Sequence, residues 1–217
     1  MLKAVGIRKT YGSVKVLKGV DLTVGKGEVV VIVGASGAGK STLLHILGTL
    51  DLPEAGSVFI RDQDIFTQSH AALAQFRNKH IGFVFQFHNL LPEFTALENV
   101  MIPGLIAGRD EKEVKVAAEA LLGKLGILDR RDHKPSEMSG GEQQRAAVAR
   151  SLINSPDIVF ADEPSGNLDS KNAAELHQLF FQLRKDMGYT FVIVTHNEEF
   201  AAMADRRIEI RDGVINS

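Results

Sequence analysis

The most informative stretch of this chain reads Gly34-Ala35-Ser36-Gly37-Ala38-Gly39-Lys40-Ser41. A glycine, four free positions and then Gly-Lys-Ser form the pattern of a phosphate-binding loop. The β-branched run 29–33 leads directly into this stretch, and residues 42–47 leave it with the spacing of a helix. The order of buried strand, glycine turn and helix favours an anion-binding loop over a glycine-rich turn that binds nothing.

Each part of this loop has a predicted task. The glycines let backbone N–H groups close around a phosphate, and the N-terminus of the following helix adds a partial positive charge. Lys40 is predicted to reach the β- and γ-phosphates of a nucleotide, and the hydroxyl of Ser41 to hold Mg²⁺. The predicted nucleotide-binding residues here are Gly34, Ala35, Ser36, Gly37, Ala38, Gly39, Lys40, Ser41 and Thr42.

The bulk composition excludes several classes of protein. With 217 residues, 44% hydrophobic and 24% charged, the chain is long enough to bury one sizeable core. The formal net charge of −2 provides no polybasic surface, so nucleic acid and anionic lipid are poor candidate partners. Because cysteine is absent, a disulfide scaffold and thiol catalysis are both excluded.

The chain carries no sign of a membrane segment of its own. Charged residues interrupt its first eight positions too early for a secretion signal, and no apolar run approaches the roughly twenty residues that span a bilayer. We therefore expect a cytoplasmic protein that acts at a membrane only through another chain. Without internal repeats or a linker, a single domain over residues 1–217 is the simplest organisation.

Further periodic segments surround the loop. Apolar residues alternate over 20–24 and 58–60, which predicts antiparallel strands on either side of the loop, and residues 208–215 read as a closing hairpin. Helical spacing appears over 110–125, and again after Asp169 until Gly188. Tyr11 lies just upstream, where its ring either packs on the sheet or stacks on adenine.

Polar side chains follow three further apolar strands. Gln86 comes after 83–85, Asp162 and Glu163 end the strand that begins at 157, and His196 follows 191–195. Open α/β sheets bind ligands at the carboxyl ends of their strands. Two adjacent carboxylates there indicate a metal-holding aspartate followed by a base for water. Taken singly, Gln86 is a routine polar residue at a strand end, and a lone histidine in the position of His196 is more often structural than catalytic.

A second helix start has an unusual composition. Ser139-Gly140-Gly141-Glu142 matches a capping box and precedes a strongly helix-forming segment. Two glycines weaken a helix by roughly 1 kcal/mol each relative to alanine, unless close approach to an anion or another chain requires them. We interpret this stretch as a second anion-facing helix end, with a simple capped helix as the alternative. The apolar segment 88–100 is either a docking surface or folds under, and its periodicity does not decide.

In this order, these pieces resemble the nucleotide-binding subunits of ATP-binding cassette (ABC) transporters over essentially the whole chain. The resemblance implies an α/β P-loop NTPase with a mostly parallel core sheet, an antiparallel β subdomain and a helical subdomain at roughly 88–155. It implies that Tyr11 stacks on adenine, that Glu163 is the general base and that His196 contacts the γ-phosphate of ATP. The implied ligands of Mg²⁺ are Ser41, Gln86 and Asp162.

The resemblance also implies partners. Members of this family form head-to-tail dimers, in which Ser139, Gly140 and Gly141 of one chain would cover the phosphate loop of the other. Closing this helix end over the γ-phosphate can then switch hydrolysis on. The segment after Gln86 would receive a cytoplasmic part of a transmembrane permease. The protein would lie on the cytoplasmic side of the inner membrane as a peripheral subunit, with no direct contact to nucleic acid.

Within the family, segments 85–100 and 166–169 are most similar to the ATPases of bacterial lipoprotein-releasing systems. Macrolide-export and cell-division relatives have similar segments. A soluble ABC protein acting on DNA or ribosomes usually carries a coiled-coil insertion or a second cassette, and this chain has neither. A small-molecule phosphotransferase would leave 139–141 unused.

Departures from the family pattern are Met138 for leucine, Glu142 for glutamine and Ser165 for threonine.

Overall fold

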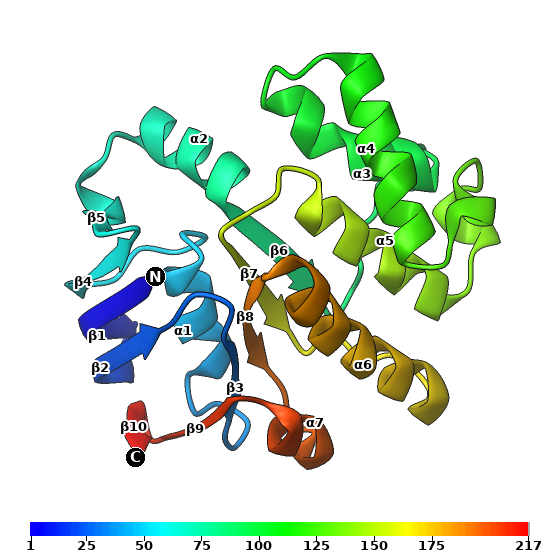
Figure 1. The fold of residues 1–217 in the computed structure, drawn as a ribbon. Coiled ribbons are helices and arrows are strands. Elements are labelled where there is room, and N and C mark those ends of the chain that lie inside the picture. The colour runs from blue at the N-terminus through cyan, green and yellow to red at the C-terminus, as the bar shows by residue number, and fades with distance from the viewer. Residues whose placement is uncertain (217) are drawn as a thin grey trace.

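The computed structural model describes residues 1–216, which form two β-sheets and seven α-helices (Figure 1). The strands are β1 (Leu2–Tyr11), β2 (Val14–Val24), β3 (Val29–Val33), β4 (Ala55–Ile60), β5 (Gln63–Asp64), β6 (Ile81–Phe85), β7 (Ile158–Asp162), β8 (Thr190–Val194), β9 (Arg206–Arg211) and β10 (Val214–Asn216). The helices are α1 (Lys40–Leu47), α2 (His70–His80), α3 (Ala96–Ile106), α4 (Glu111–Lys124), α5 (Gly140–Leu152), α6 (Ser170–Met187) and α7 (Glu198–Met203).

The larger sheet has the strand order β10-β9-β3-β8-β7-β6. Its strands pair in parallel from β9 to β6, and β10 adds an antiparallel hairpin at the edge. The predicted mostly parallel core and the predicted closing hairpin are therefore both confirmed. Because parallel strands are covered on both faces, β3 and β8 are buried at every position, as their β-branched runs indicated.

Successive residues of each central strand point to opposite faces and so belong to two hydrophobic cores. In β3, Val29, Val31 and Val33 join the core formed with α3 to α6, whereas Val30 and Ile32 join the core that holds α1 and the smaller sheet. The central sheet is thus shared by two layers, and this arrangement fixes the strand ends relative to both.

The smaller sheet is antiparallel and has the order β2-β1-β4-β5, which confirms the antiparallel part of the predicted fold. Its first strand, β1, was not predicted from the sequence. The register of β1 shifts between Ala4 and Ile7, where Gly6 adopts a φ of 61° and donates its N–H to Asp21. This bulge breaks the alternation of apolar residues that marks a strand.

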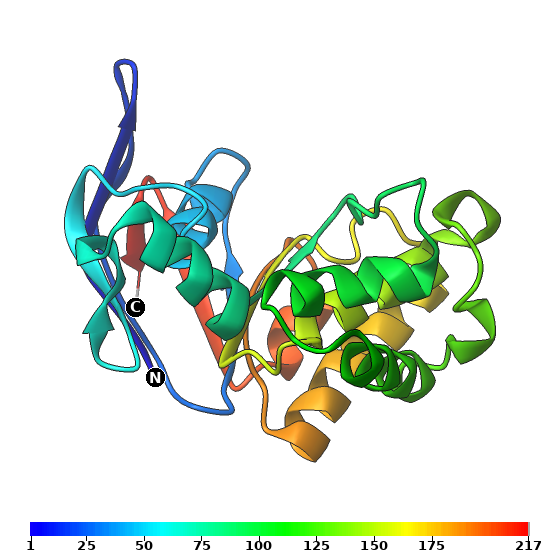
Figure 2. The ribbon, with the colours of Figure 1, turned by 90° about the horizontal axis from the view of Figure 1, so that it is seen from above.

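Helices α3, α4 and α5 pack together on one side of the molecule, away from the antiparallel sheet (Figure 2). The sequence left 88–100 without a helix, but α3 begins at Ala96, capped by Thr95 and Glu98 in a full capping box. Pro103 inside α3 and the buried polar Asn99 hid its helical pattern. A single domain with a helical part at 88–155 stays a prediction.

No helix between residues 1 and 216 combines the length and the hydrophobicity that crossing a bilayer requires.

Candidate nucleotide-binding and hydrolysis site

Four adjacent parallel strands end at the same edge of the larger sheet. The phosphate loop follows β3, His196 follows β8, Glu163 follows β7 and Gln86 follows β6. Because β3, β8, β7 and β6 are neighbours in that order, the sheet brings together polar residues that lie far apart in the sequence. This is the place where open α/β sheets bind ligands, as the positions of these residues predicted.

The phosphate loop has the backbone that anion binding needs. Gly39 stands at the N-cap of α1 with a φ of 102°, so no side chain occupies the first N–H groups of the helix. A Cβ on Gly34 would lie 2.2 Å from the carbonyl oxygen of Ile210, which leaves room for glycine alone. Lys40 Nζ donates to the carbonyls of Gly34 and Ala35 at 2.8 and 2.9 Å, so the ammonium group is held against the loop.

The three predicted metal ligands lie at this edge, and two of them are in contact. Ser41 Oγ donates to Asp162 Oδ1 at 3.0 Å, and His45 Nε2 lies 3.5 Å from the other carboxylate oxygen of Asp162. Gln86 Nε2 donates to Asn167 Oδ1 at 3.0 Å, which occupies the amide nitrogen and leaves the amide oxygen for a cation.

This donor set fits Mg²⁺. A hydroxyl, an amide oxygen and a carboxylate are hard oxygen ligands, and Mg²⁺ completes its octahedron with phosphate and water. Between residues 1 and 216 no group of three or more His, Cys, Asp or Glu side chains could hold a metal by itself.

Glu163 and His196 form a pair beside the loop. His196 Nδ1 lies 3.0 Å from Glu163 Oε2, and the backbone N–H of His196 donates to the same oxygen at 3.4 Å. Glu163 adopts a φ of 45°, a conformation that costs energy for a residue with a side chain. Its N–H donates to the carbonyl of Val194 at 2.9 Å, which holds the turn in place. The carboxylate is thus fixed at the sheet edge by two segments.

Tyr11 presents a half-exposed ring near the start of α1. Its hydroxyl donates to Asp51, and Lys9 Nζ lies 5.1 Å from the centre of the ring. The hydrogen bond to Asp51 raises the pKa of Tyr11 above its ordinary value. The side chain is 49% exposed, so a fixed ring with a free surface is available for stacking.

The Ser139 helix start forms the predicted capping box. Glu142 N–H donates to Ser139 Oγ at 3.3 Å, and Ser139 N–H donates to Glu142 Oε2 at 2.8 Å. The bond from Ser139 and a second one from Arg130 hold the pKa of Glu142 below its usual range. Within residues 1–216 no hydrogen bond joins this helix start to the phosphate loop of the same chain.

Comparison with known proteins agrees with this geometry. The family model described as "ABC transporter" matches residues 17–166. The chain belongs to the ABC transporter ATP-binding family. The dimeric bacterial ABC transporter cassette MJ0796 has 40% sequence identity and superposes with a TM-score of 0.92, over 100% of this chain and 97% of that one. A dimeric post-hydrolysis state of the same cassette, bound to ADP and Pi, gives a TM-score of 0.91 at 39% identity over the same shares.

Curated relatives of this ABC ATPase include lipoprotein-releasing system ATP-binding proteins named LolD. The protein from Cytophaga hutchinsonii is 63% identical over 99% of this chain and 98% of its own length. The one from Porphyromonas gingivalis is 58% identical over 100% of this chain and 99% of its own length. The chain is therefore an ATP-binding, ATP-hydrolysing transport subunit, and the predicted P-loop fold is confirmed.

The two glycines at the start of α5 differ in the space that this ABC ATPase leaves for a side chain. A Cβ on Gly141 would lie 2.8 Å from Asn172 Oδ1 and 3.1 Å from its Cγ, so a side chain there would displace Asn172. Gly140 is exposed, and the nearest atom to an added Cβ would be a Leu168 methyl at an ordinary 3.7 Å. Packing within the chain therefore explains Gly141 and leaves Gly140 unexplained.

This difference gives a first prediction. Gly141→Ala is expected to lower the free energy of unfolding by about 1 kcal/mol, because the methyl group displaces Asn172. Gly140→Ala is expected to leave it unchanged or raise it by up to about 1 kcal/mol, because alanine favours the helix. Urea unfolding of the two variants checks this, and equal destabilisation of both would contradict it.

Sequence reasoning assigned no role at the site to several residues that surround it. Gly166 leaves room for Gln86, because a Cβ there would lie 2.9 Å from Gln86 Nε2, and Asn167 returns a bond to the Gln86 carbonyl at 3.2 Å. A cavity of about 370 Å³ lies beside the phosphate loop. Its rim carries the cationic residues Lys15, Lys18 and Arg211. Lys15 and Lys18 lie on β2 and Arg211 ends β9, so the three charges come together only in the fold.

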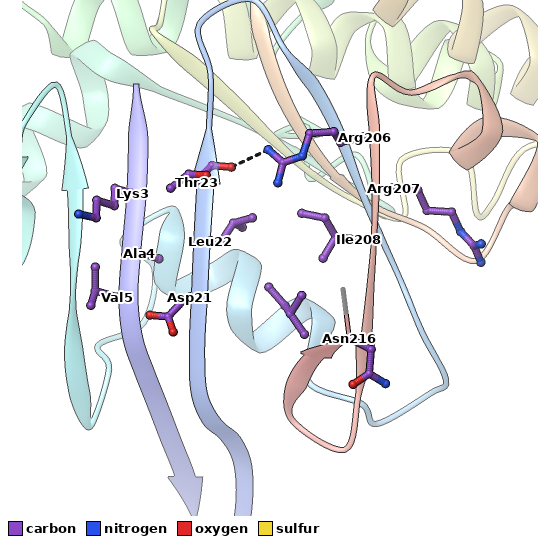
Figure 3. Close-up of a pocket in the computed structure, with 11 residues that line it drawn as sticks. Lys3, Ala4, Val5, Asp21, Leu22, Thr23, Arg206, Arg207, Ile208 and Asn216 are labelled. Carbon is purple, nitrogen blue, oxygen red and sulfur yellow. Dashed lines mark hydrogen bonds between the residues drawn. The ribbon is translucent and has the colours of Figure 1, made fainter.

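A second cavity, of about 600 Å³, lies between strands β1 and β2 on one side and β9 and β10 on the other (Figure 3). Both arginines that line it are already paired. Arg206 contacts Glu28 and the carbonyl of Thr23, and Arg207 contacts Glu198. The cavity lies away from the strand ends that hold the catalytic candidates, so its volume does not identify it as the nucleotide site.

Proposed function

We propose that this chain is the ATPase subunit of a bacterial lipoprotein-releasing ABC transporter, and that it powers a separate permease in the inner membrane. The convergence of the phosphate loop with the Glu163–His196 pair at one sheet edge is the observation that carries the ATPase part. The similarity to LolD proteins over nearly the whole chain supports the lipoprotein part.

The proposed mechanism assigns one task to each group. Lys40 and the first N–H groups of α1 bind the phosphates, and the ring of Tyr11 stacks on adenine. Ser41, Gln86 and Asp162 hold Mg²⁺, which neutralises charge on the phosphate oxygens when bound. Glu163 accepts the proton of the attacking water, which makes it the general base.

His196 keeps this carboxylate oriented and donates toward the γ-phosphate. Its Nδ1 already lies against Glu163, and its side chain is 76% exposed. An exposed imidazole on a fixed backbone can face the transferred phosphoryl group, while its other edge holds the base. Phosphoryl transfer depends mainly on such positioning and on charge stabilisation.

The active form is proposed to be a head-to-tail dimer. Gly140 is exposed and has room for a side chain, so a requirement for glycine at this position would come from a contact outside the chain. The capped start of α5 offers N–H groups and a helix dipole, and a γ-phosphate bound by Lys40 of a second copy fits these. The related MJ0796 cassette is dimeric. Two copies would then enclose two ATP molecules.

The permease is proposed to dock on the apolar surface around the segment after Gln86. Phe87, Leu91 and Phe94 are 69%, 44% and 41% exposed, and a groove of about 460 Å³ lies between α2, β6, α3 and α5. Asn99 holds the loop before α3 rigid, because its side chain bonds Leu91 in both directions. A rigid apolar patch favours a preformed docking surface.

The same surface is connected to the catalytic elements. Arg150 of α5 donates to the carbonyls of His88 and Asn89 at 2.7 and 2.6 Å, and Gln144 of α5 donates to the carbonyl of Phe85 at 3.1 Å. Movement of a docked permease would therefore reach both Gln86 and α5, the helix that Ser139 caps. The subunit is proposed to sit on the cytoplasmic face of the inner membrane through this contact.

A second prediction follows for Leu91→Asp and Phe94→Asp. Each is expected to leave ATP binding intact and to lower ATP-driven transport at least about tenfold, because a buried unpaired carboxylate opposes an apolar interface. Val116→Asp is the matched control, since Val116 is 66% exposed on α4, outside this surface. Full transport by both test variants would exclude this docking surface.

Reconstitution tests the proposed function itself. The chain is purified together with its permease from detergent-solubilised membranes and placed in vesicles that contain an acylated lipoprotein. ATP-dependent release of the lipoprotein to a soluble acceptor is the expected result. Export of a macrolide instead, or co-purification of rRNA or DNA without a permease, would contradict it.

A further inference from the structure

A buried imidazole joins the two segments that carry Glu163 and His196. His177 of α6 is 6% exposed, and its Nε2 lies 2.9 Å from Ser165 Oγ, a hydrogen bond. The same ring stacks on Phe200, with 3.9 Å between ring centres and 10° between the planes. One side chain thus contacts the loop after Glu163 and the helix after His196.

The Ser165 contact anchors a turn that begins at the proposed base. Gly166 N–H donates to the carbonyl of Glu163 at 3.0 Å, and Leu168 N–H donates to the carbonyl of Ser165 at 3.1 Å. Glu163 itself has the positive φ described above, so its position depends on support from outside the strand. The hydroxyl of Ser165 supplies such support by tying the turn to α6. Ser165 is also one of the departures from the family pattern.

The Phe200 contact anchors the other segment. Phe200 N–H donates to Asn197 Oδ1 at 2.7 Å, and Asn197 N–H donates to Thr195 Oγ1 at 3.1 Å. Phe200 therefore belongs to the first turn of α7, directly after His196. Stacking on a fully buried phenylalanine fixes this turn against α6.

The pairing of β7 with β8 and the contact between Glu163 and His196 also join the two segments. A cavity of about 530 Å³ lies between them and is lined by Ser165, His177, His196 and Asn197, among others. Burial lowers the pKa of His177 to about 4, so the ring is neutral at neutral pH and can serve as a hydrogen-bonding, stacking spacer.

We propose that His177 is a positioning residue, which keeps Glu163 and His196 in register by bonding Ser165 and stacking on Phe200. The inference rests on the proposed roles of Glu163 and His196. His177 reaches the reaction only through these two segments, so its effect is expected on the rate of hydrolysis and not on ATP binding.

Three single variants of the full chain and one double variant, His177→Phe with Ser165→Ala, test this. His177→Phe keeps the stacking ring and removes the bond, Ser165→Ala removes the other partner, and Ser165→Thr keeps a hydroxyl. His177→Phe and Ser165→Ala are each expected to lower kcat for ATP about five- to tenfold, with KM within about twofold of the parent. The double variant is expected to lose no more than either single one, because both remove the same bond. Ser165→Thr is expected to keep kcat within about twofold.

Tyr189→Phe is the matched control, since Tyr189 is a buried aromatic whose ring packs on Phe191, and its variant is expected to keep full activity. Parent-like kcat in His177→Phe and Ser165→Ala, or multiplicative losses in the double variant, would overturn the proposal. Glu163→Gln in the same assay separates the hypothesis for Glu163 from the hypothesis for His177. If Glu163→Gln still hydrolyses ATP, Glu163 is not the base. If Glu163→Gln is inactive and His177→Phe is fully active, only the role of His177 is refuted.

Discussion

Glu163→Gln is expected to bind ATP and to lose nearly all hydrolysis. A missing general base costs roughly 10² to 10⁴ in rate. Glutamine has nearly the same shape as glutamate, so the contact with His196 and the positive-φ turn are conserved sterically. The bound nucleotide would then be trapped before hydrolysis, and the protein would accumulate as an ATP-bound dimer.

Steady-state hydrolysis and gel filtration with ATP and Mg²⁺ measure this directly. Glu199→Gln is the matched control, because Glu199 is an exposed carboxylate on α7 and the change removes the same charge. Glu199→Gln is expected to keep the parent rate. Undiminished turnover by Glu163→Gln would remove Glu163 from the role of base.

Lys40→Met is expected to fail one step earlier, at ATP binding. A charged hydrogen bond to phosphate contributes about 1.5 to 3 kcal/mol, so the Kd for ATP should rise roughly tenfold to a hundredfold. Lys40 also holds the loop through the carbonyls of Gly34 and Ala35, and this support disappears with it.

Isothermal titration calorimetry with ATP measures the Kd that is expected to rise in Lys40→Met. Lys26→Met is the control, because Lys26 lies in the exposed turn before β3 and carries the same charge. The pair of predictions separates binding from chemistry: Glu163→Gln binds without turning over, and Lys40→Met does not bind well. ATP affinity unchanged in Lys40→Met would place the phosphates elsewhere.

Much of the fold could be predicted because its central strands are locally unambiguous. The runs 29–33 and 191–194 are apolar throughout, and turn residues or polar side chains bound them. Strand β1 and helix α3 escaped prediction for opposite reasons. The bulge near Gly6 interrupts the two-residue alternation of apolar side chains that marks a strand. Asn99 and Pro103 interrupt the 3.6-residue spacing that marks a helix. In both cases a tertiary contact compensates for the local irregularity.

The sequence indicated which polar residues lie at the strand ends, while their roles in the candidate site stay predictions and their contacts could not be predicted. The strand ends indicated Gln86, Asp162, Glu163 and His196 from sequence. Their partners depend on segments that meet only in the fold, as the bond between Gln86 and Asn167 shows. The two glycines of α5 are a further example. A side chain at position 141 would meet Asn172 of α6, whereas a side chain at position 140 would have room, and the sequence alone does not show this difference. The bridging role inferred for His177 likewise had no signal in its own neighbourhood.

The claim that ATP is bound between two copies is tested most directly by a structure of Glu163→Gln with ATP and Mg²⁺. We expect the γ-phosphate to contact Lys40 of one subunit and Ser139 and Gly140 of the other. ATP held entirely within one subunit, with Gly140 far from any phosphate, would contradict the account.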